Sequence, residues 1–314
     1  MRILSLTANF FEPLRHNWGH EHFRREIARQ HEVFFCGPGH PYRPMRYVEA
    51  HKIVEWKGPF DLVLTVSVKF TRNWLRDMHR ITTIPKAHIV LDYVVGKQFN
   101  VLYDSLFDSH KYDILFARTL LELENIVVAR SEPIFYLPYS VDEKIYSDTG
   151  VSRDIDAAAI WSTGAGYPNR SKIQVLLRTM RRRRGRTKGL RSYCGRECNQ
   201  AYVDLLRRSK IFVGSVGVRK PLAQKVTESM ACGCLHLTDK PKDLERQGFV
   251  DGEHLVLYDG LPDLREKISY YLAHDSERKQ IAEAGRDFVL KNHTTKLRVE
   301  QFTKILTEFL EKRE

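Results

Sequence analysis

Short apolar runs alternate with amphipathic segments along most of the chain. In the first half, the mostly apolar runs are Ile3–Leu6, Val33–Cys36, Leu62–Val66, His88–Leu91, Ile114–Ala117 and Ile134–Leu137. Runs of this length are typical of parallel strands that are buried on both faces. Stretches with helical spacing lie between several of them, at Glu21–Arg29 and Thr119–Ala129. The pattern predicts a doubly wound α/β domain that ends near Pro138.

A second cycle of strands and helices follows a polar segment, Asp142–Arg153, in which the periodicity is lost. Its apolar runs are Ala157–Trp161, Ile211–Val213, Cys234–Leu237 and Leu255–Leu257. The last stretch, Ser276–Glu311, has helical spacing and many charges. We therefore predict a Rossmann-like domain over residues 1–142, a linker over 143–154, a second Rossmann-like domain over 155–290 and a C-terminal helix over 291–314.

Composition agrees with this division and with a soluble protein. The 314 residues exceed the ~150 residues of a typical domain, so length also favours two domains. No apolar run approaches the roughly 20 residues of a membrane span, and Met1–Leu6 turns polar too early for a secretory signal. The five scattered cysteines fit free thiols in a reducing cytoplasm. Cys194 and Cys198 lack a second ligand pair, so we expect no metal site.

The net charge of +12, from 51 basic and 39 acidic residues, is unevenly distributed. Its densest run comprises Arg178, Arg181, Arg182, Arg183, Arg184, Arg186, Lys188 and Arg191. Such a cluster, and Arg181–Arg184 in particular, suits DNA, an anionic membrane surface or an acidic glycan. The alternative is a solvated helix end, because cations are favoured at the C-terminus of the helix that begins near Tyr167. The whole cluster favours a polyanionic partner.

Residues 225–239 (KVTESMACGCLHLTD) combine a short amphipathic helix, small residues and an apolar strand. Helix N-termini bind anions, because their first N–H groups are unpaired and the helix dipole is positive there. A carboxylate one turn into such a helix, here Glu228, can accept two hydrogen bonds from the vicinal hydroxyls of a ribose. These features suggest a nucleotide-diphosphate site. A surface glutamate on an ordinary packed helix would give the same pattern.

The motif Glu228-x-Met230-Ala231-Cys232-Gly233, followed by a buried strand, resembles the nucleotide-sugar helix of the group-1 glycosyltransferases. Further matches, to the CgeB-like (spore-maturation) branch, are Ser209–Ile211, Leu237–Asp239, Gly248–His254, Tyr270–His274, Ile281–Arg286 and His293–Thr294. The N-terminal half is similar only at Tyr112–Phe116 and Leu137–Asp142. The resemblance implies the GT-B fold, in which two doubly wound Rossmann-like domains face a central cleft.

The resemblance also implies a donor site in the second domain. Arg170 and Lys225 would neutralise the diphosphate, and Glu228 would bind the ribose. The glycine-rich turn that follows the first strand of this domain would let the backbone approach the ligand. With Gly19 of the first domain, expected from its position, and Lys220, which could contact a phosphate, the expected donor-binding residues are Gly164, Tyr167, Arg170, Tyr193, Cys194, Lys225 and Glu228. The contacts of Tyr193 and Cys194 would be backbone contacts to the base.

The first domain is expected to hold the acceptor. The segment Asn9–His20 is rich in aromatic and ionisable residues, and Gly19 stands where a helix starting near His20 would approach the donor phosphates. Asp92 ends the fourth predicted strand and would point into the same crevice. An inverting reaction needs a base that deprotonates the acceptor hydroxyl. The candidates are His16, His20, Asp92 and Glu12, each of which also suits a capping or solvated role.

One position departs from the family pattern. Many group-1 enzymes carry a glutamate eight positions before the ribose-binding one, where it contacts the donor sugar. This chain has Lys220 there. A lysine can contact a phosphate, but the sugar-binding role does not carry over. The donor sugar and the stereochemical outcome therefore stay open.

We predict a cytoplasmic hexosyl- or related glycosyltransferase that moves a sugar from a nucleotide-diphosphate sugar, such as a UDP-sugar, to an acceptor hydroxyl. The acceptor would be a glycan, a small molecule or a polyanion. No cofactor besides the donor and no metal is expected, since cationic side chains can stabilise the leaving group. The alternatives are a DNA-modifying glycosyltransferase acting on hydroxylated bases and a non-catalytic nucleic-acid-binding GT-B protein. Lys220 allows the latter, whereas Glu228 and Arg170 argue against it.

Overall fold

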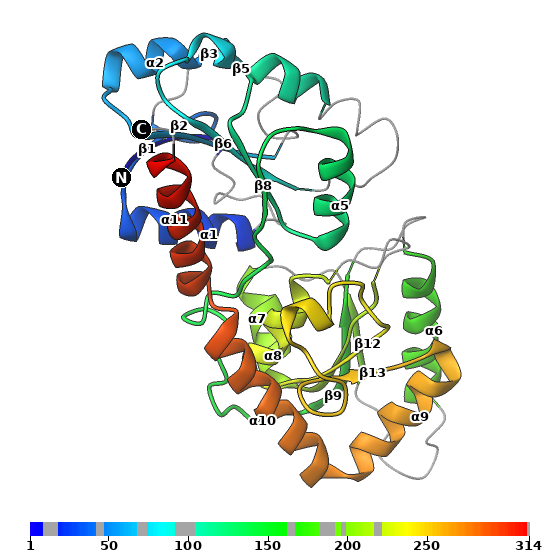
Figure 1. Cartoon of the computed structure of the whole chain (residues 1–314). Coiled ribbons are helices and arrows are strands. Elements are labelled where there is room, and N and C mark those ends of the chain that lie inside the picture. The colour runs from blue at the N-terminus through cyan, green and yellow to red at the C-terminus, as the bar shows by residue number, and fades with distance from the viewer. Residues whose placement is uncertain are drawn as a thin grey trace. The chain divides into compact units, whose positions relative to one another are not determined.

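The computed structural model describes residues 1–8, 18–41, 47–67, 74–91, 104–161, 167–182, 192–195, 199–216 and 222–312. The chain divides into two compact units, shown in Figure 1. The first unit comprises Met1–Pro138 and Arg298–Glu314, and the second comprises Tyr139–Leu297. In the part of the chain that the structure describes, no helix combines the length and the apolar character that a membrane crossing requires.

The first unit is built on a six-stranded sheet in the order β2-β1-β4-β6-β7-β8. Its strands are β1 (Arg2–Leu6), β2 (Glu32–Cys36), β4 (Leu62–Val66), β6 (Lys86–Val90), β7 (Ile114–Ala117) and β8 (Ile134–Tyr136). All neighbours pair in parallel. A separate two-stranded sheet pairs β3 (Val48–Glu49) with β5 (Leu75–Arg76). β4, β6 and β7 are buried at every position, which explains their nearly continuous apolar runs.

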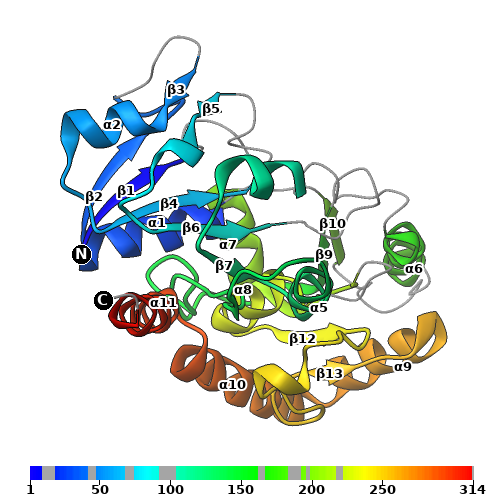
Figure 2. The same ribbon diagram turned by 45° about the horizontal axis from the view of Figure 1, so that its top comes forward.

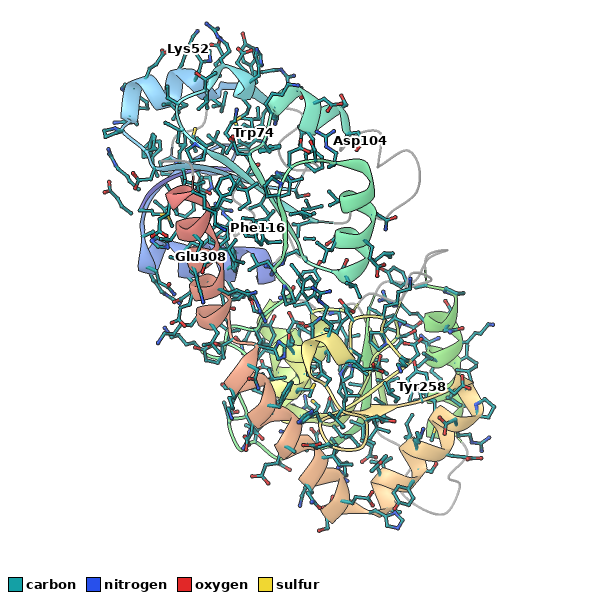
Figure 3. All side chains as sticks on the ribbon, viewed as in Figure 1. Lys52, Trp74, Asp104, Phe116, Tyr258 and Glu308 are labelled. Atoms are coloured by element: carbon teal, nitrogen blue, oxygen red, sulfur yellow. The ribbon has the colours of Figure 1, made fainter. Side chains whose placement is uncertain are left out.

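Helices cover both faces of this sheet (Figures 1 and 2). They are α1 (Trp18–Gln30), α2 (Ala50–Lys57), the 3-10 turn η1 (Met78–Arg80), the helix at 104–110, α5 (Leu120–Ala129) and α11 (Thr295–Glu311). On one face, the rings of Phe23 in α1 and Phe302 in α11 pack edge to face with centroids 5.6 Å apart. The ring centroid of Phe302 also lies 4.9 Å from that of Phe116 in β7. Phe116 is labelled in Figure 3. The end of the chain therefore completes the core of the first unit.

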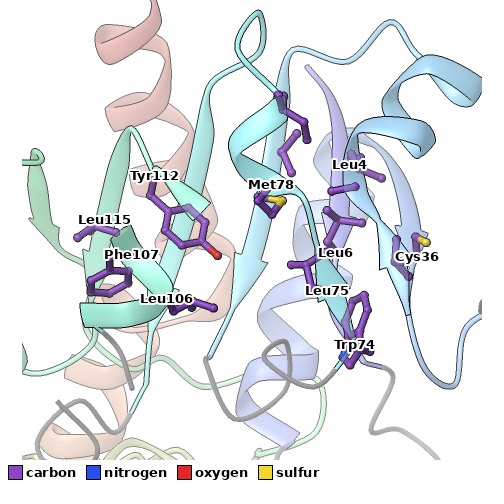
Figure 4. Close-up of a cluster of buried hydrophobic side chains, with 14 of the residues drawn as sticks. Leu4, Leu6, Cys36, Trp74, Leu75, Met78, Leu106, Phe107, Tyr112 and Leu115 are labelled. Atoms are coloured by element: carbon purple, nitrogen blue, oxygen red, sulfur yellow. The ribbon is translucent and has the colours of Figure 1, made fainter. Parts of the chain in front are cut away.

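The other face of the sheet carries a second apolar cluster, shown in Figure 4. It joins Leu4 and Leu6 of β1 to Met78 of η1 and to Phe107 and Tyr112 near the start of β7. These side chains come from segments far apart in the sequence. The cluster fixes η1 and the helix at 104–110 against the sheet, since burial of apolar surface is the main force that holds such layers together.

The second unit contains a five-stranded parallel sheet in the order β10-β9-β11-β12-β13. The strands are β9 (Ile155–Ile160), β10 (Ser192–Gly195), β11 (Ser209–Val213), β12 (Leu235–Thr238) and β13 (Val256–Leu257). The helices are α6 (Pro168–Arg182), α7 (Asn199–Arg208), α8 (Lys225–Ala231), the 3-10 turn η2 (Glu245–Gln247), α9 (Gly260–Ala273) and α10 (Asp275–Asn292). α6, α9 and α10 bury Leu177, Ile268 and Ile281 against one face of the sheet.

The predicted fold class is confirmed: both units are doubly wound parallel α/β structures. The structure differs from the sequence-based division at the predicted linker, residues 143–154, which belongs to the second unit. Tyr146 in this segment is only 2% exposed. Arg207 of α7 donates hydrogen bonds to the carbonyls of Ile145 and Ser147 at 2.9 and 3.0 Å. The segment is polar in sequence, yet a buried ring and an arginine from α7 anchor it.

Candidate functional site

The carboxyl ends of the parallel strands meet at one edge of the second sheet, where doubly wound folds place their ligands. β9 leads into Trp161, β11 into the segment 214–216, and β12 into Asp239. α6 begins at Pro168 after β9, and α8 begins at Lys225 after β11. The first turns of both helices therefore lie at this edge together with the strand ends.

Arg170, in the first turn of α6, is held against aromatic rings. Its guanidinium carbon lies 3.4 Å from the centre of the Tyr167 ring and 5.6 Å from that of Trp161. Its Nη2 donates to the carbonyl of Ser215 at 3.2 Å. Burial lowers the pKa of Arg170, while Tyr167 and Asp239 act in the opposite direction. The structure thus fixes a half-buried positive charge at the edge of the sheet.

Asp239 organises the loop that follows β11. Its Oδ1 accepts a hydrogen bond from the N–H of Val216 at 2.7 Å, and the hydroxyl of Ser215 lies 3.4 Å from its Oδ2. Tyr258, labelled in Figure 3, donates from its hydroxyl to the carbonyl of Gly214 at 2.8 Å. Burial raises the pKa of Tyr258, so the phenol stays protonated and remains a donor. These bonds hold the loop where it meets Arg170.

Glu228 lies in α8 and is only 6% exposed. The hydroxyl of Tyr202 in α7 donates to its Oε2 at 2.7 Å. The hydroxyl of Tyr146 also bonds to Glu228, and the two tyrosine rings meet edge to face with centroids 6.2 Å apart. Burial raises the pKa of both phenols, and the negative charge of Glu228 raises it further. Two protonated phenols therefore hold the carboxylate from one side.

Lys225 lies one turn before Glu228 on α8. Its Nζ is 4.1 Å from the centre of the Tyr202 ring. Burial lowers the pKa of Lys225, the carboxylate of Glu228 raises it, and the positive charge of Arg170 lowers it again. Lys225 is therefore within electrostatic reach of both Arg170 and Glu228. We call these three side chains, two cations and one carboxylate, the charged triad.

The helix that carries two members of the charged triad is short. α8 has seven residues, and Gln224 before it already has helical dihedral angles of −53° and −31°. The N–H of Glu228 bonds to the carbonyl of Gln224 at 3.2 Å. Positive charge for an anion therefore comes mainly from the side chains of Arg170 and Lys225 and less from the helix terminus.

The remaining predicted site residues are only partly described. Gly19 and His20 lie in the first turn of α1, and Tyr193 and Cys194 lie in β10, where the structure describes the backbone alone. Outside the described residues are Glu12, His16, Asp92, Gly164 and Lys220. Within the basic run, Arg181 and Arg182 end α6, while Arg183 and Arg184 lie outside the described ranges.

Three residues of this site were not predicted from the sequence: Tyr146, Tyr202 and Asp239. Tyr202 is one apolar position of an amphipathic helix, and Tyr146 lies in the segment interpreted as a linker. Nothing local marks either residue as a partner of Glu228. Asp239 had a usable signal, because an acidic residue directly after a buried strand lies at the carboxyl edge of a parallel sheet.

Comparison with known proteins gives a family match for the part of the chain that contains this site. Residues 164–304 match the family model described as glycosyl transferase-like. This range includes all three members of the charged triad, along with Tyr202 and Asp239. No protein of curated function matches the sequence.

Solved structures resemble the whole chain at low sequence identity. Sucrose-phosphate synthase from Thermosynechococcus elongatus is 11% identical, with a TM-score of 0.67 over 99% of each chain. Anabaena HepE in complex with UDP-glucose is 13% identical, with a TM-score of 0.68 over 98% of this chain and 100% of its own. An α-glucosyltransferase in complex with UDP-glucose and abasic-site DNA is 10% identical, with a TM-score of 0.70 over 98% and 99%.

At these identities the structural similarity establishes the fold and nothing finer. The similarity extends over both units, whereas the family match covers the second unit from residue 164 onward and part of α11. The two findings agree on the class of protein. This chain has the GT-B fold and carries a glycosyltransferase-like domain over residues 164–304.

Proposed function

We propose that this protein transfers a sugar from a nucleotide-diphosphate sugar to an acceptor hydroxyl. The observation that carries the proposal is the charged triad of Arg170, Lys225 and Glu228 at the carboxyl edge of the second sheet. It brings together the residue types needed to hold a diphosphate and a ribose. It also lies inside the segment that matches the glycosyltransferase-like family.

The two cations suit a diphosphate leaving group. Burial lowers the pKa of Lys225 most, Glu228 raises it, and repulsion from Arg170 lowers it by less than Glu228 raises it. A bound diphosphate would relieve this repulsion. Electrostatic interactions are stronger at a partly buried site than in water. Arg170 and Lys225 would therefore stabilise the charge that develops on the departing nucleotide diphosphate, with no metal or cofactor besides the donor required.

Glu228 would bind the ribose hydroxyls while its two tyrosines hold it in place. An ionised carboxylate has about four acceptor sites. The hydroxyls of Tyr202 and Tyr146 use part of this capacity. The rest is sufficient for two hydrogen bonds from vicinal hydroxyls. A carboxylate fixed on one side by protonated phenols is oriented before the nucleotide binds, which reduces the entropic cost of binding.

UDP-glucose is the first donor to test, and hexosyl transfer is the proposed activity. Structures similar to this chain include HepE with UDP-glucose and an α-glucosyltransferase with UDP-glucose and DNA. We also propose the CgeB-like branch of the group-1 glycosyltransferases, on the motif order within residues 164–304. The proposal specifies neither the acceptor nor whether the reaction retains or inverts the anomeric configuration.

The second candidate function is glycosylation of DNA, which one observation favours. α6 exposes Lys172 and Arg178, and the sequence of the helix continues into the basic run. One of the similar structures contains DNA. Hydroxylated bases in DNA would then be the acceptors, and the basic side chains of α6 and of the basic run would bind the DNA phosphates.

Titration calorimetry with UDP, UDP-glucose and uridine tests the main proposal. We expect UDP and UDP-glucose to bind and uridine to bind far more weakly, because only the first two carry the diphosphate. UDP release from UDP-glucose, with and without added acceptors, then reports turnover. Glu266→Ala, on the exposed side of α9, is a control that changes charge away from the triad. Equal affinity for UDP and uridine, or no binding of any of the three, would contradict the proposal.

A further inference from the structure

The first unit contains an open cavity of about 370 Å³ that the proposed reaction does not use. Its walls come from three segments: β5 with the following Asp77, η1, and the helix at 104–110. The lining residues are Leu75, Arg76, Asp77, His79, Ser105, Leu106, Ser109 and His110. Cavities of roughly 300–1,000 Å³ accommodate small molecules.

The cavity belongs to the edge of the sheet that is opposite to the usual ligand-binding edge. η1 leads into the start of β6 at Lys86, and the helix at 104–110 leads into the start of β7 at Ile114. These are the amino ends of the strands. Donor and acceptor sites of doubly wound sheets lie at the carboxyl ends. A ligand in this cavity would therefore occupy a second site, separate from the carboxyl edge of the same sheet.

A chain of buried hydrogen bonds leads to the cavity wall from inside the sheet. Nδ1 of His88 lies 2.6 Å from the hydroxyl of Thr65. Thr65 donates to the hydroxyl of Tyr112 at 2.9 Å, and that hydroxyl lies 3.0 Å from Nδ1 of His110. Figure 4 shows Tyr112 beside Leu106 and Phe107, in the apolar cluster of the first unit. Of these four residues, only His110, at the end of the series of hydrogen bonds, lines the cavity.

The direction in which these hydrogen bonds are donated fixes the tautomer of His110. Each hydroxyl has one proton to donate. Thr65 uses its proton on Tyr112, so Tyr112 uses its own on Nδ1 of His110. Nδ1 of His110 is therefore an acceptor, and the ring proton sits on Nε2. The ring of His110 thus has one donor, Nε2–H, available to a ligand in the cavity.

The charges around His110 are positive. Burial, and after it the positive charges of His79, Lys86 and Arg76, lowers the pKa of His110 to about 4. The ring is therefore neutral near pH 7, yet it lies in a positive local potential. Lys86 is buried, with Nζ bonded to the carbonyl of Ile81 at 2.8 Å, and so adds a fixed charge beneath the cavity. The one carboxylate of the lining, Asp77, is not among the groups that shift His110.

We propose that this cavity binds a small phosphorylated and hydroxylated molecule of the sugar-phosphate class. The phosphate would lie between Arg76, His79 and Nε2–H of His110, where donors and positive charge coincide. Asp77, which also lines the cavity, would accept a hydrogen bond from a ligand hydroxyl. The side chains of Leu75 and Leu106 would contact the ring carbons. This site is independent of the donor site in the second unit.

Calorimetric titration with glucose 6-phosphate tests the site, with glucose and inorganic phosphate as matched probes. We expect glucose 6-phosphate to bind more tightly than either probe alone, with and without saturating UDP. Arg76→Gln should weaken its binding about tenfold, as expected for the loss of a charge-assisted contact. Arg80→Gln is the control, because it makes the same charge change four residues away and Arg80 does not line the cavity. UDP affinity should be unchanged in both variants.

The tautomer is tested separately by NMR of the histidine ring nitrogens. We expect His110 to carry its proton on Nε2 in the parent protein, and Tyr112→Phe to weaken this preference while the ring packing is kept. Three results would overturn the proposal: no binding of glucose 6-phosphate, equal binding of glucose, or equal loss in Arg76→Gln and Arg80→Gln. Failure of UDP to bind would instead count against the proposed transferase function and leave this site untouched.

Discussion

Tyr202 and Glu228 form a buried hydrogen bond of 2.7 Å between two helices, from the phenol of α7 to the carboxylate of α8. Both residues are at most 6% exposed. The bond makes Glu228 part of the core of the second unit as well as of the proposed ribose site. Substitutions of Glu228 therefore affect folding stability and ligand binding together, and experiments must separate the two.

Glu228→Gln should weaken UDP binding by about 2–3 kcal/mol, because a charge-assisted hydrogen-bond pair to the ribose becomes a neutral one. The amide keeps an oxygen that can accept from Tyr202, so we expect smaller losses of stability than with Glu228→Ala. Calorimetry measures the affinity, and chemical denaturation measures the stability. Unchanged UDP affinity in a folded Glu228→Gln protein would rule out the ribose assignment.

Tyr202→Phe should reduce the unfolding free energy by about 1–3 kcal/mol, since it leaves an oxygen of a buried carboxylate without one partner. If Tyr202 orients Glu228, the KM for the donor should also rise, with little change in kcat. Tyr270→Phe is a matched control, because its hydroxyl bonds to Glu277 at 2.8 Å on the exposed surface. A stability loss in Tyr202→Phe with an unchanged KM would make the bond purely structural.

Arg170→Ala should weaken binding of UDP far more than binding of uridine, because only the diphosphate carries the charge that Arg170 meets. Arg170→Lys should recover part of the loss, since the charge returns without the stacking on Tyr167. Calorimetry with both ligands measures the difference. Equal losses of affinity for UDP and uridine would instead mean that Arg170 has a structural role at the carboxyl edge of the second sheet.

Replacing Arg181–Arg184 with glutamine tests the polyanion hypothesis. If this run binds DNA, the variant should bind duplex DNA more weakly and with a shallower salt dependence, because each phosphate contact releases condensed counterions. Turnover with a small neutral acceptor should hardly change. The test is the logarithm of the affinity for duplex DNA, plotted against the logarithm of the salt concentration for the parent and the variant. Parallel plots would mean that the basic run is a solvated helix end.

The second unit should lose stability as the pH falls. Burial lowers the pKa of His236 from 6.5 to about 3. The unfolded chain therefore binds a proton at a higher pH than the folded chain does. The contribution of His236 to the unfolding free energy should fall by about 1.4 kcal/mol per pH unit as the pH drops from about 6.5 towards 3. Denaturation of His236→Gln should show a shallower pH slope than the parent, whereas His274→Gln, at an exposed position, should match the parent.

The apolar pattern determined the fold class and most of the strands. Buried parallel strands need apolar side chains on both faces, so β4 and β7 could be located from their runs alone. The start of α5 was also predictable, because Thr119 and Glu122 form a capping box whose residues are three positions apart in the sequence. These features depend on neighbouring residues, and the sequence contains them directly.

Tertiary structure decided the partners of the functional residues. The sequence suggested Arg170, Lys225 and Glu228, but only the fold brings Tyr202 and Tyr146 to the carboxylate. Tyr146 looked like part of a linker because its segment is polar, and its burial depends on contacts with α7. Asp239 reaches the loop after β11 across the sheet edge. Periodicity reports which side of an element is buried, whereas the partner across a long sequence separation depends on how the elements pack.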